Sequence, residues 1–199
     1  IAWGDSMSKK IRLVYGVGIN DADYFVTEYE NGKRVMCPYY RAWSDMLRRA
    51  YSDKYKQKNI SYRDVTVCEE WHSFIRFRAW MVGHDWEVKE LDKDILFQGN
   101  KVYSPDTCVF VDKAVNLFLT DRAAARGEWP LGVCWHEQNQ MFMGQCNNPF
   151  TKKYEYLGLF TCPNQAHLAW KKRKYELACQ LADLQTDERV AEALRTRYK

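Results

Sequence analysis

Apolar side chains return with helical spacing in three stretches of the chain. The first begins at Pro38, and its apolar positions are Tyr40, Trp43, Leu47, Ala50 and Tyr51. The second runs from about Glu69 to Met81 and buries Trp71, Phe74, Phe77 and Met81. The third covers Asn164 to Leu184. Because residues three and four apart share a face of an α-helix, each stretch predicts a helix with one buried side.

Alternation of apolar and polar residues predicts strands ahead of the third helix. Gly132 to Cys146 alternates around a polar Glu-Gln-Asn-Gln turn, which is typical of a hairpin. Lys153 to Phe160 predicts a third strand. Three strands packed on one helix make a small module that is stable by itself.

The two ends of the chain carry weaker patterns. Ile11 to Val17 is a short β-like segment, and the polar stretch that follows it to Lys33 predicts an arm or an edge strand with a loop. Asp187 to Lys199 predicts a charged helix with Val190 and Leu194 as its only strong anchors. We expect this last helix to pack loosely or to mediate association.

The central stretch from Leu91 to Asn116 predicts a hairpin that leads into a helix. Gly99-Asn100 supplies the positive φ of a tight turn, and Ser104-Pro105-Asp106 breaks the chain before the next apolar run. Cys108 to Val111 is β-branched or aromatic and suits a strand. The pattern is thus β-β-α.

These elements place the chain in the α+β class. We expect an N-terminal arm over residues 1–33 and a helical ββα part over 34–121. A three-stranded antiparallel sheet on a helix, followed by the charged helix, is expected over 122–199.

Composition and charge narrow the class of protein. The 199 residues are 46% apolar and 15% aromatic, which is typical of a folded chain. Of the formal charge of +4, the excess lies after Asp121, where 12 Lys+Arg stand against 8 Asp+Glu. The sequence has no apolar run long enough for a membrane span and no secretory signal, so we expect a soluble, cytoplasmic protein. Seven scattered cysteines predict free thiols.

Candidate metal chemistry lies in the central stretch. Asp92 and Asn116 stand on different arms of the predicted unit. Oxygen ligands of this kind suit a hard divalent cation such as Mg²⁺ or Mn²⁺. Cys68 and His72, with Cys37 or Cys108, lack the paired spacing of a zinc site, so structural zinc is not expected.

The run LDKDILFQGNKVYSPDTCVFVDKAVN resembles the divergent HNH (ββα-metal) nuclease motif of small phage proteins. Two upstream segments, Tyr40 to Tyr51 and Val67 to Phe77, resemble helices of the same family. The resemblance implies a homing-endonuclease-like enzyme that hydrolyses DNA, with Asp92 and Asn116 as metal ligands. If the protein is encoded by a phage, it acts in the cytoplasm of the host cell.

This sequence departs from the family pattern at two positions. Lys93 stands where the family has its histidine base, and an ammonium beside Asp92 and Asp94 does not readily accept a proton. Lys93 is instead expected to bind the scissile phosphate. Thr107 replaces an asparagine that orients the base. The group that activates the nucleophile remains open among His84, His72 and Tyr103.

The C-terminal pattern resembles the Apetala2/ERF-type DNA-binding domain. The matching residues are Arg126-Gly127, Gly132-Val133-x-Trp135, Phe142-x-Gly144, Tyr156-Leu157-Gly158-x-Phe160 and Ala166-x-x-Ala169-Trp170. In that family the exposed face of the sheet enters the major groove of double-stranded DNA. By position, the implied DNA contacts are Arg126, His136, Gln138, Gln145, Lys152, Lys153 and Glu155, of which the basic side chains suit phosphate or guanine and glutamine suits adenine.

Basic residues on the first predicted helix extend the DNA-binding hypothesis. Arg48 and Arg49 lie on its polar face and are expected to contact phosphate. Lys171 to Lys174 forms a second basic run, for which a phosphate clamp and a solvated surface both remain open.

Two functions therefore compete, with a third behind them. The first is a Mg²⁺-dependent DNA endonuclease or nickase, for which cutting both strands at one site requires a homodimer or two successive nicks. The second is a DNA-binding phage protein that has kept the fold and lost catalysis, acting in regulation or in interference with host defence. The third is a basic surface that meets an acidic protein partner.

Overall fold

The computed structural model describes residues 12–120 and 128–199. It contains helices and several small sheets, so the α+β class is confirmed. The chain divides into two compact units, Ile1–Glu87 with Phe97–Phe110, and Val88–Leu96 with Val111–Lys199. This division groups part of the central stretch with the C-terminal sheet. The boundaries expected at residues 33 and 121 stay predictions.

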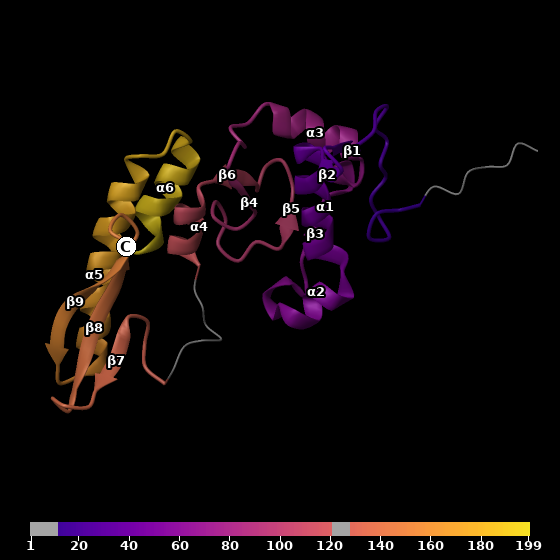
Figure 1. Cartoon of the computed structure of the whole chain (residues 1–199). Coiled ribbons are helices and arrows are strands. Elements are labelled where there is room, and N and C mark those ends of the chain that lie inside the picture. The colour runs from indigo at the N-terminus through magenta and orange to yellow at the C-terminus, as the bar shows by residue number, and fades with distance from the viewer. Residues whose placement is uncertain (1–11, 121–127) are drawn as a thin grey trace, which may run out of the picture. The chain divides into compact units, whose positions relative to one another are not determined.

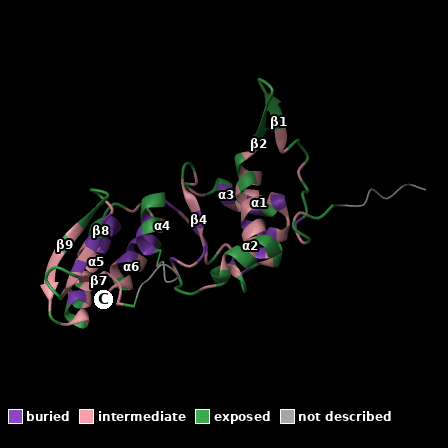
Figure 2. Cartoon of the chain, turned by 60° about the horizontal axis from the view of Figure 1, so that its bottom comes forward, coloured by how far each residue is buried: buried purple, intermediate pink, exposed green. Residues whose placement is uncertain are grey.

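The first unit combines short strands with aromatic helices. Its elements in chain order are β1 (Thr27–Glu30), β2 (Lys33–Met36), α1 (Pro38–Tyr51), α2 (Asp53–Lys58), η1 (Ile60–Tyr62), β3 (Thr66–Val67), η2 (Glu69–His72), α3 (Phe74–Val82) and β5 (Val102–Tyr103). Strands β1 and β2 form an antiparallel hairpin, and β3 pairs in parallel with β5. Figure 2 shows exposed residues along the β1–β2 hairpin and buried residues on α1.

The predicted helix over Pro38–Tyr51 is confirmed, but the one over Glu69–Met81 is divided. Ser73 ends the short η2 turn and begins α3, because its hydroxyl accepts the backbone N–H of Arg76 at 3.2 Å. That hydroxyl also donates to Asp21 Oδ2 at 2.6 Å. The predicted core of this segment, Trp71, Phe74, Phe77 and Met81, is buried. It packs with Trp43, whose indole N–H donates to the carbonyl of Trp71 at 2.7 Å.

The second unit joins one strand and one helix of the central stretch to the C-terminal sheet. Its elements are β4 (Glu90–Asp92), α4 (Lys113–Leu119), β7 (Val133–His136), β8 (Met141–Asn148), β9 (Lys153–Phe160), α5 (Pro163–Ala182) and α6 (Glu188–Arg197). Strand β6 (Val109–Val111), which pairs with β4, contains the boundary between the two units. Gly99 has the predicted positive φ of 82°, but the strands on either side of its turn do not form the predicted hairpin, because β5 pairs with β3 instead of β4.

The C-terminal module matches the predicted order of three strands and a helix. Strands β7, β8 and β9 form an antiparallel sheet in that order, with an irregularity in register between Gly144 and Gln145. Helix α5 lies along the sheet (Figure 1). Helix α6 packs on α5 with Val190 and Leu194 fully buried. The expected loose packing of this last helix was therefore wrong.

Two further predictions concern the cysteines and membrane-spanning helices. None of the seven cysteines forms a disulfide, as predicted. Among the helices in 12–120 and 128–199, none combines the length and the apolar character that crossing a bilayer requires.

Candidate metal centre and nucleic-acid interface

In the second unit, strand β4 and helix α4 carry three candidate metal ligands with side-chain oxygens, which are Glu90, Asp92 and Asn116. Glu90 and Asp92 are two positions apart on β4 and therefore point to the same face of the strand. Asn116, from the middle of α4, donates a hydrogen bond from Nδ2 to Glu90 Oε2 at 2.7 Å. This bond directs the amide of Asn116 to β4. Glu90 was missing from the predicted site, although its place two residues before Asp92 on a strand was the signal.

Asp92 ends strand β4 through its own side chain. Its Oδ1 accepts the backbone N–H groups of Asp94 at 2.8 Å and Ile95 at 2.9 Å. Burial, reinforced by the negative charge of Asp94, raises the pKa of Asp92 to about 6. A bound cation would compensate the negative charge of ionised Asp92 and so favour its ionisation.

Lys93 occupies a more enclosed position than the sequence indicated. It is 6% exposed, and its ammonium lies 3.0 Å from Asp94 Oδ2. The role of this buried, paired ammonium at a phosphate stays a prediction.

The donor set of β4 and α4 fits a hard divalent cation. Two carboxylates, Glu90 and Asp92, and the amide of Asn116 offer oxygen ligands, which Mg²⁺ and Mn²⁺ prefer. Over the ranges that the structure describes, no three His, Cys, Asp or Glu side chains cluster to hold a metal ion. One or two carboxylates, completed by water and substrate phosphate, are the usual ligands of a magnesium ion that works on phosphate esters.

The three candidate activators lie in the first unit and differ in their surroundings. Tyr103 is 1% exposed and lies beneath the guanidinium of Arg49, so it is a core residue. His72 Nε2 lies 3.2 Å from the hydroxyl of Tyr51. His84 Nδ1 lies 2.8 Å from the carbonyl of Trp80, which can only accept, so a neutral His84 carries its lone pair on Nε2. Their catalytic roles stay predictions.

Thr107 has a structural role in the turn after β5. Its hydroxyl donates to the carbonyl of Val102 at 2.8 Å and lies 2.8 Å from the hydroxyl of Ser104. These contacts close the turn ahead of β6 and account for a threonine at this position.

The three-stranded sheet has one face on α5 and one open face. A Cβ on Gly144 would lie 3.3 Å from the carbonyl of Ala166, so Gly144 faces the helix. Gln145 lies on the opposite face, where its Nε2 is 3.6 Å from Cys134 Sγ. The same face carries Tyr154 and Tyr156 of β9, which are 71% and 64% exposed.

Most of the predicted DNA contacts lie on this open face or in its turns. His136 and Gln145 belong to the open face by strand alternation. Gln138 and Lys152 are exposed at the β7–β8 and β8–β9 turns. Lys153 is exposed at the start of β9, where strand alternation places it on the face of Glu155. Arg126 lies outside the described residues. The two exposed tyrosines were missed, although Tyr156 belongs to the motif that resembles the third strand of that family.

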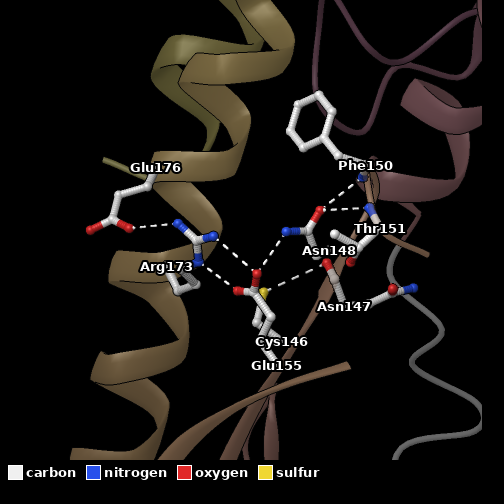
Figure 3. Close-up of polar contacts among 8 residues, drawn as sticks. All are labelled: Cys146, Asn147, Asn148, Phe150, Thr151, Glu155, Arg173 and Glu176. Atoms are coloured by element: carbon white, nitrogen blue, oxygen red, sulfur yellow. Dashed lines mark hydrogen bonds and ion pairs between the residues drawn. The ribbon is translucent and has the colours of Figure 1, made fainter. Parts of the chain in front are cut away.

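Glu155 does not lie on the open face as predicted. Arg173 of α5 donates to both of its oxygens, at 2.6 and 3.0 Å, and the amide of Asn148 donates to Oε1 at 2.6 Å (Figure 3). These bonds hold the pKa of Glu155 at about 2. Asn148 Oδ1 in turn accepts the backbone N–H groups of Phe150 and Thr151. This network fixes the β8–β9 turn on α5.

The two predicted arginines of α1 are held by neighbours. Arg48 pairs with Asp45 at 3.1 Å and lies over the ring of Tyr55 at 5.0 Å. Arg49 donates to the carbonyl of Asp45 at 3.3 Å and lies over the ring of Tyr103. Arg48 retains an exposed side, whereas Arg49 serves mainly to hold α1 in place.

Comparisons of the chain with protein-family models, curated proteins and solved structures find no match. The two resemblances therefore stay predictions that rest on the quoted motifs.

Proposed function

We propose that the chain is a divalent-metal-dependent DNA endonuclease or nickase. The observation that carries the proposal is the hydrogen bond between Asn116 and Glu90, because it brings the predicted ligand of α4 to the carboxylate strand β4. Glu90, Asp92 and Asn116 would hold Mg²⁺ or Mn²⁺. Such a protein works on DNA in the cytoplasm of the cell that contains it.

The residues of the site divide the chemistry among them. A bound Mg²⁺ supplies charge stabilisation on the phosphate oxygens and the leaving oxygen. Asp92 and Glu90 provide the negative charge that retains the cation, and Asn116 completes the oxygen set as a neutral ligand. Neutrality at Asn116 matters because a third carboxylate beside Glu90 would add repulsion before the cation arrives.

The open face of the C-terminal sheet would deliver the DNA. It combines amide side chains, which read base edges, with exposed lysines in the β8–β9 turn, which suit phosphate. Double-stranded DNA is therefore the proposed substrate, and a homodimer is one way to cut both strands.

Cleavage of supercoiled plasmid tests this function. Relaxed or linear product is expected from the parent with Mg²⁺ or Mn²⁺ and not with EDTA. Asp92→Ala and Asn116→Ala should form neither product while retaining DNA binding. Asp106→Ala removes an exposed carboxylate outside the site and should cut like the parent. Cleavage by Asp92→Ala equal to that of the parent would refute the proposed metal centre.

A second function is favoured by the surroundings of Lys93. Its ammonium is buried against Asp94, so the residue at the position of the usual base is a cation that a neighbouring carboxylate already engages. This arrangement suits a DNA-binding protein that has lost catalysis. Absence of cleavage by the parent, with DNA binding intact in a gel shift and weaker at high salt, would favour this second function.

A further inference from the structure

The second unit contains a pocket on the face of α5 that points away from the three-stranded sheet. It has a volume of about 480 Å³ and is lined by Leu168, Lys171, Lys172, Tyr175, Tyr198 and Lys199. Four of these residues, at 168, 171, 172 and 175, follow the three- and four-residue spacing of one helix face. The other two come from the end of α6 and the residue after it, and α6 packs along α5 (Figure 1).

The basic run Lys171–Lys174 lies on α5, where Lys171 and Lys172 have different surroundings from Arg173 and Lys174. Arg173 is engaged by Glu155 and Glu176. Lys174 is half-buried, and its amine donates to the carbonyl of Phe118 at 2.7 Å. Lys171 and Lys172 instead line the pocket, and within the described residues neither has an ion pair or a hydrogen bond from its amine. The charge of these two lysines is therefore available to a ligand.

The lining combines positive charge with flat apolar surface. Among the described residues, no Asp or Glu side chain lines the pocket. Leu168 is 62% exposed, which leaves apolar surface open at the mouth. The ring of Tyr198 is held edge-on by Phe118 and Trp170, with centroids 6.0 Å away in both cases, so its position is set by packing.

These properties select a ligand that is both anionic and aromatic. A free phosphate would use the lysines but not the tyrosines, and an apolar peptide would use the tyrosines but not the lysines. A nucleotide uses both, because bases stack on aromatic side chains while lysines neutralise the backbone. The depression is open to solvent, as a site for one nucleotide within a longer strand has to be.

We propose that this pocket binds a nucleotide of single-stranded nucleic acid, with Lys171 and Lys172 at the phosphate and Tyr175 and Tyr198 at the base. The site is separate from β4 and does not depend on a bound metal. It gives the protein a place for an unpaired strand in addition to the duplex surface of the sheet.

Fluorescence anisotropy with a fluorescein-labelled oligothymidylate, in EDTA, tests the site on the full chain. Binding by the parent is expected, and Lys171→Glu with Lys172→Glu should weaken it at least tenfold. Loss of the two lysines should also reduce the slope of log affinity against log salt by about 0.7, the contribution of one neutralised phosphate on a single strand. Lys54→Glu changes an exposed lysine in the first turn of α2 and should leave the affinity unchanged. No binding by the parent, or unchanged binding by the double variant, would overturn the proposal.

An abasic strand of the same length separates the base from the phosphate. Tyr175→Leu keeps apolar bulk but removes the ring, so it should weaken oligothymidylate binding about tenfold and abasic binding much less. Circular dichroism should show that each variant retains the helices of the parent. Equal effects of Tyr175→Leu on the two strands would overturn the base contact.

Discussion

Asn116 donates a hydrogen bond to Glu90 over 2.7 Å and thereby joins helix α4 to strand β4. Sequence reasoning paired Asn116 with Asp92 alone, whereas the structure adds a second carboxylate on the same face of β4. This relationship changes the expected metal set from two protein ligands to three. It also gives the amide a role in the absence of metal, since it neutralises part of the charge of Glu90.

Asn116→Asp is expected to make the stability of the protein depend on metal. The variant exchanges the hydrogen bond for repulsion between two carboxylates, which should lower the free energy of unfolding by about 1 kcal/mol in EDTA. Mn²⁺ should restore the loss, because a cation between the carboxylates removes the repulsion. Thermal melting of parent and variant, with EDTA and with Mn²⁺, measures both effects. Equal melting in EDTA would show that the bond contributes nothing to stability.

Lys174 predicts an increase of stability at alkaline pH. Burial lowers its pKa from 10.5 to about 8. Between these values the unfolded chain binds more protons than the folded one, so the free energy of unfolding rises with pH. The gain is at most about 3 kcal/mol. Urea titrations of the parent and of Lys174→Met, at pH 7 and at pH 10, should show this rise in the parent alone. A parallel rise in both would assign it to other groups.

The ion pair of Glu155 is expected to lose its contribution to the free energy of unfolding in acid. Its pKa falls from 4.5 to about 2 through its bonds to Arg173 and Asn148. The stabilisation is therefore complete above about pH 4.5 and is lost as the pH falls toward 2. The side chain is 28% exposed, so solvent screening limits the effect to about 1 kcal/mol. Glu155→Gln should be less stable than the parent at neutral pH, and the difference should vanish near pH 2. A difference that persists at pH 2 would contradict the linkage.

Tyr156 predicts a selective loss of DNA affinity. Because its side chain is 64% exposed, Tyr156→Ala should change the free energy of unfolding by less than about 0.5 kcal/mol. If the open face contacts DNA, the same change should weaken duplex binding by roughly tenfold. Tyr29→Ala alters a tyrosine of β1 that is 75% exposed and provides the control. Gel shifts that show equal affinity for Tyr156→Ala and the parent would place the duplex elsewhere.

Elements with strong periodicity were predictable from the sequence. The strand over Lys153–Phe160 and the helix over Pro38–Tyr51 have the predicted bounds. The hairpin of β1 and β2 was missed because its strands, TEYE and KRVM, lack an apolar face. The turn between them, Asn31-Gly32, has positive φ at both residues and was the available signal.

A prediction based on polarity alone assigns the side chains of β9 to the wrong faces of the sheet. Lys153 and Glu155 are charged and Tyr154 and Tyr156 are aromatic, so alternation suggests that the tyrosines are buried. The ion pair of Glu155 with Arg173 reverses this order, since it stabilises a charge on the helix side of the sheet. Such a pairing joins residues far apart in the sequence, and no local pattern encodes it. The hydrogen bond of Glu90 with Asn116 is likewise not encoded locally, although the place of Glu90 two residues before Asp92 indicated which face of the strand it shares.

The central claim is that Glu90, Asp92 and Asn116 form a metal centre. A Mn²⁺ titration tests it, with binding measured as the decrease of the electron paramagnetic resonance signal of the free ion. Titrations with and without a DNA duplex should show saturable binding to the parent and to Asp106→Ala, and a loss of that binding in Asp92→Ala and in Glu90→Ala. Failure of the parent to bind Mn²⁺ in either condition, or retention of the same affinity by Asp92→Ala, would contradict the account.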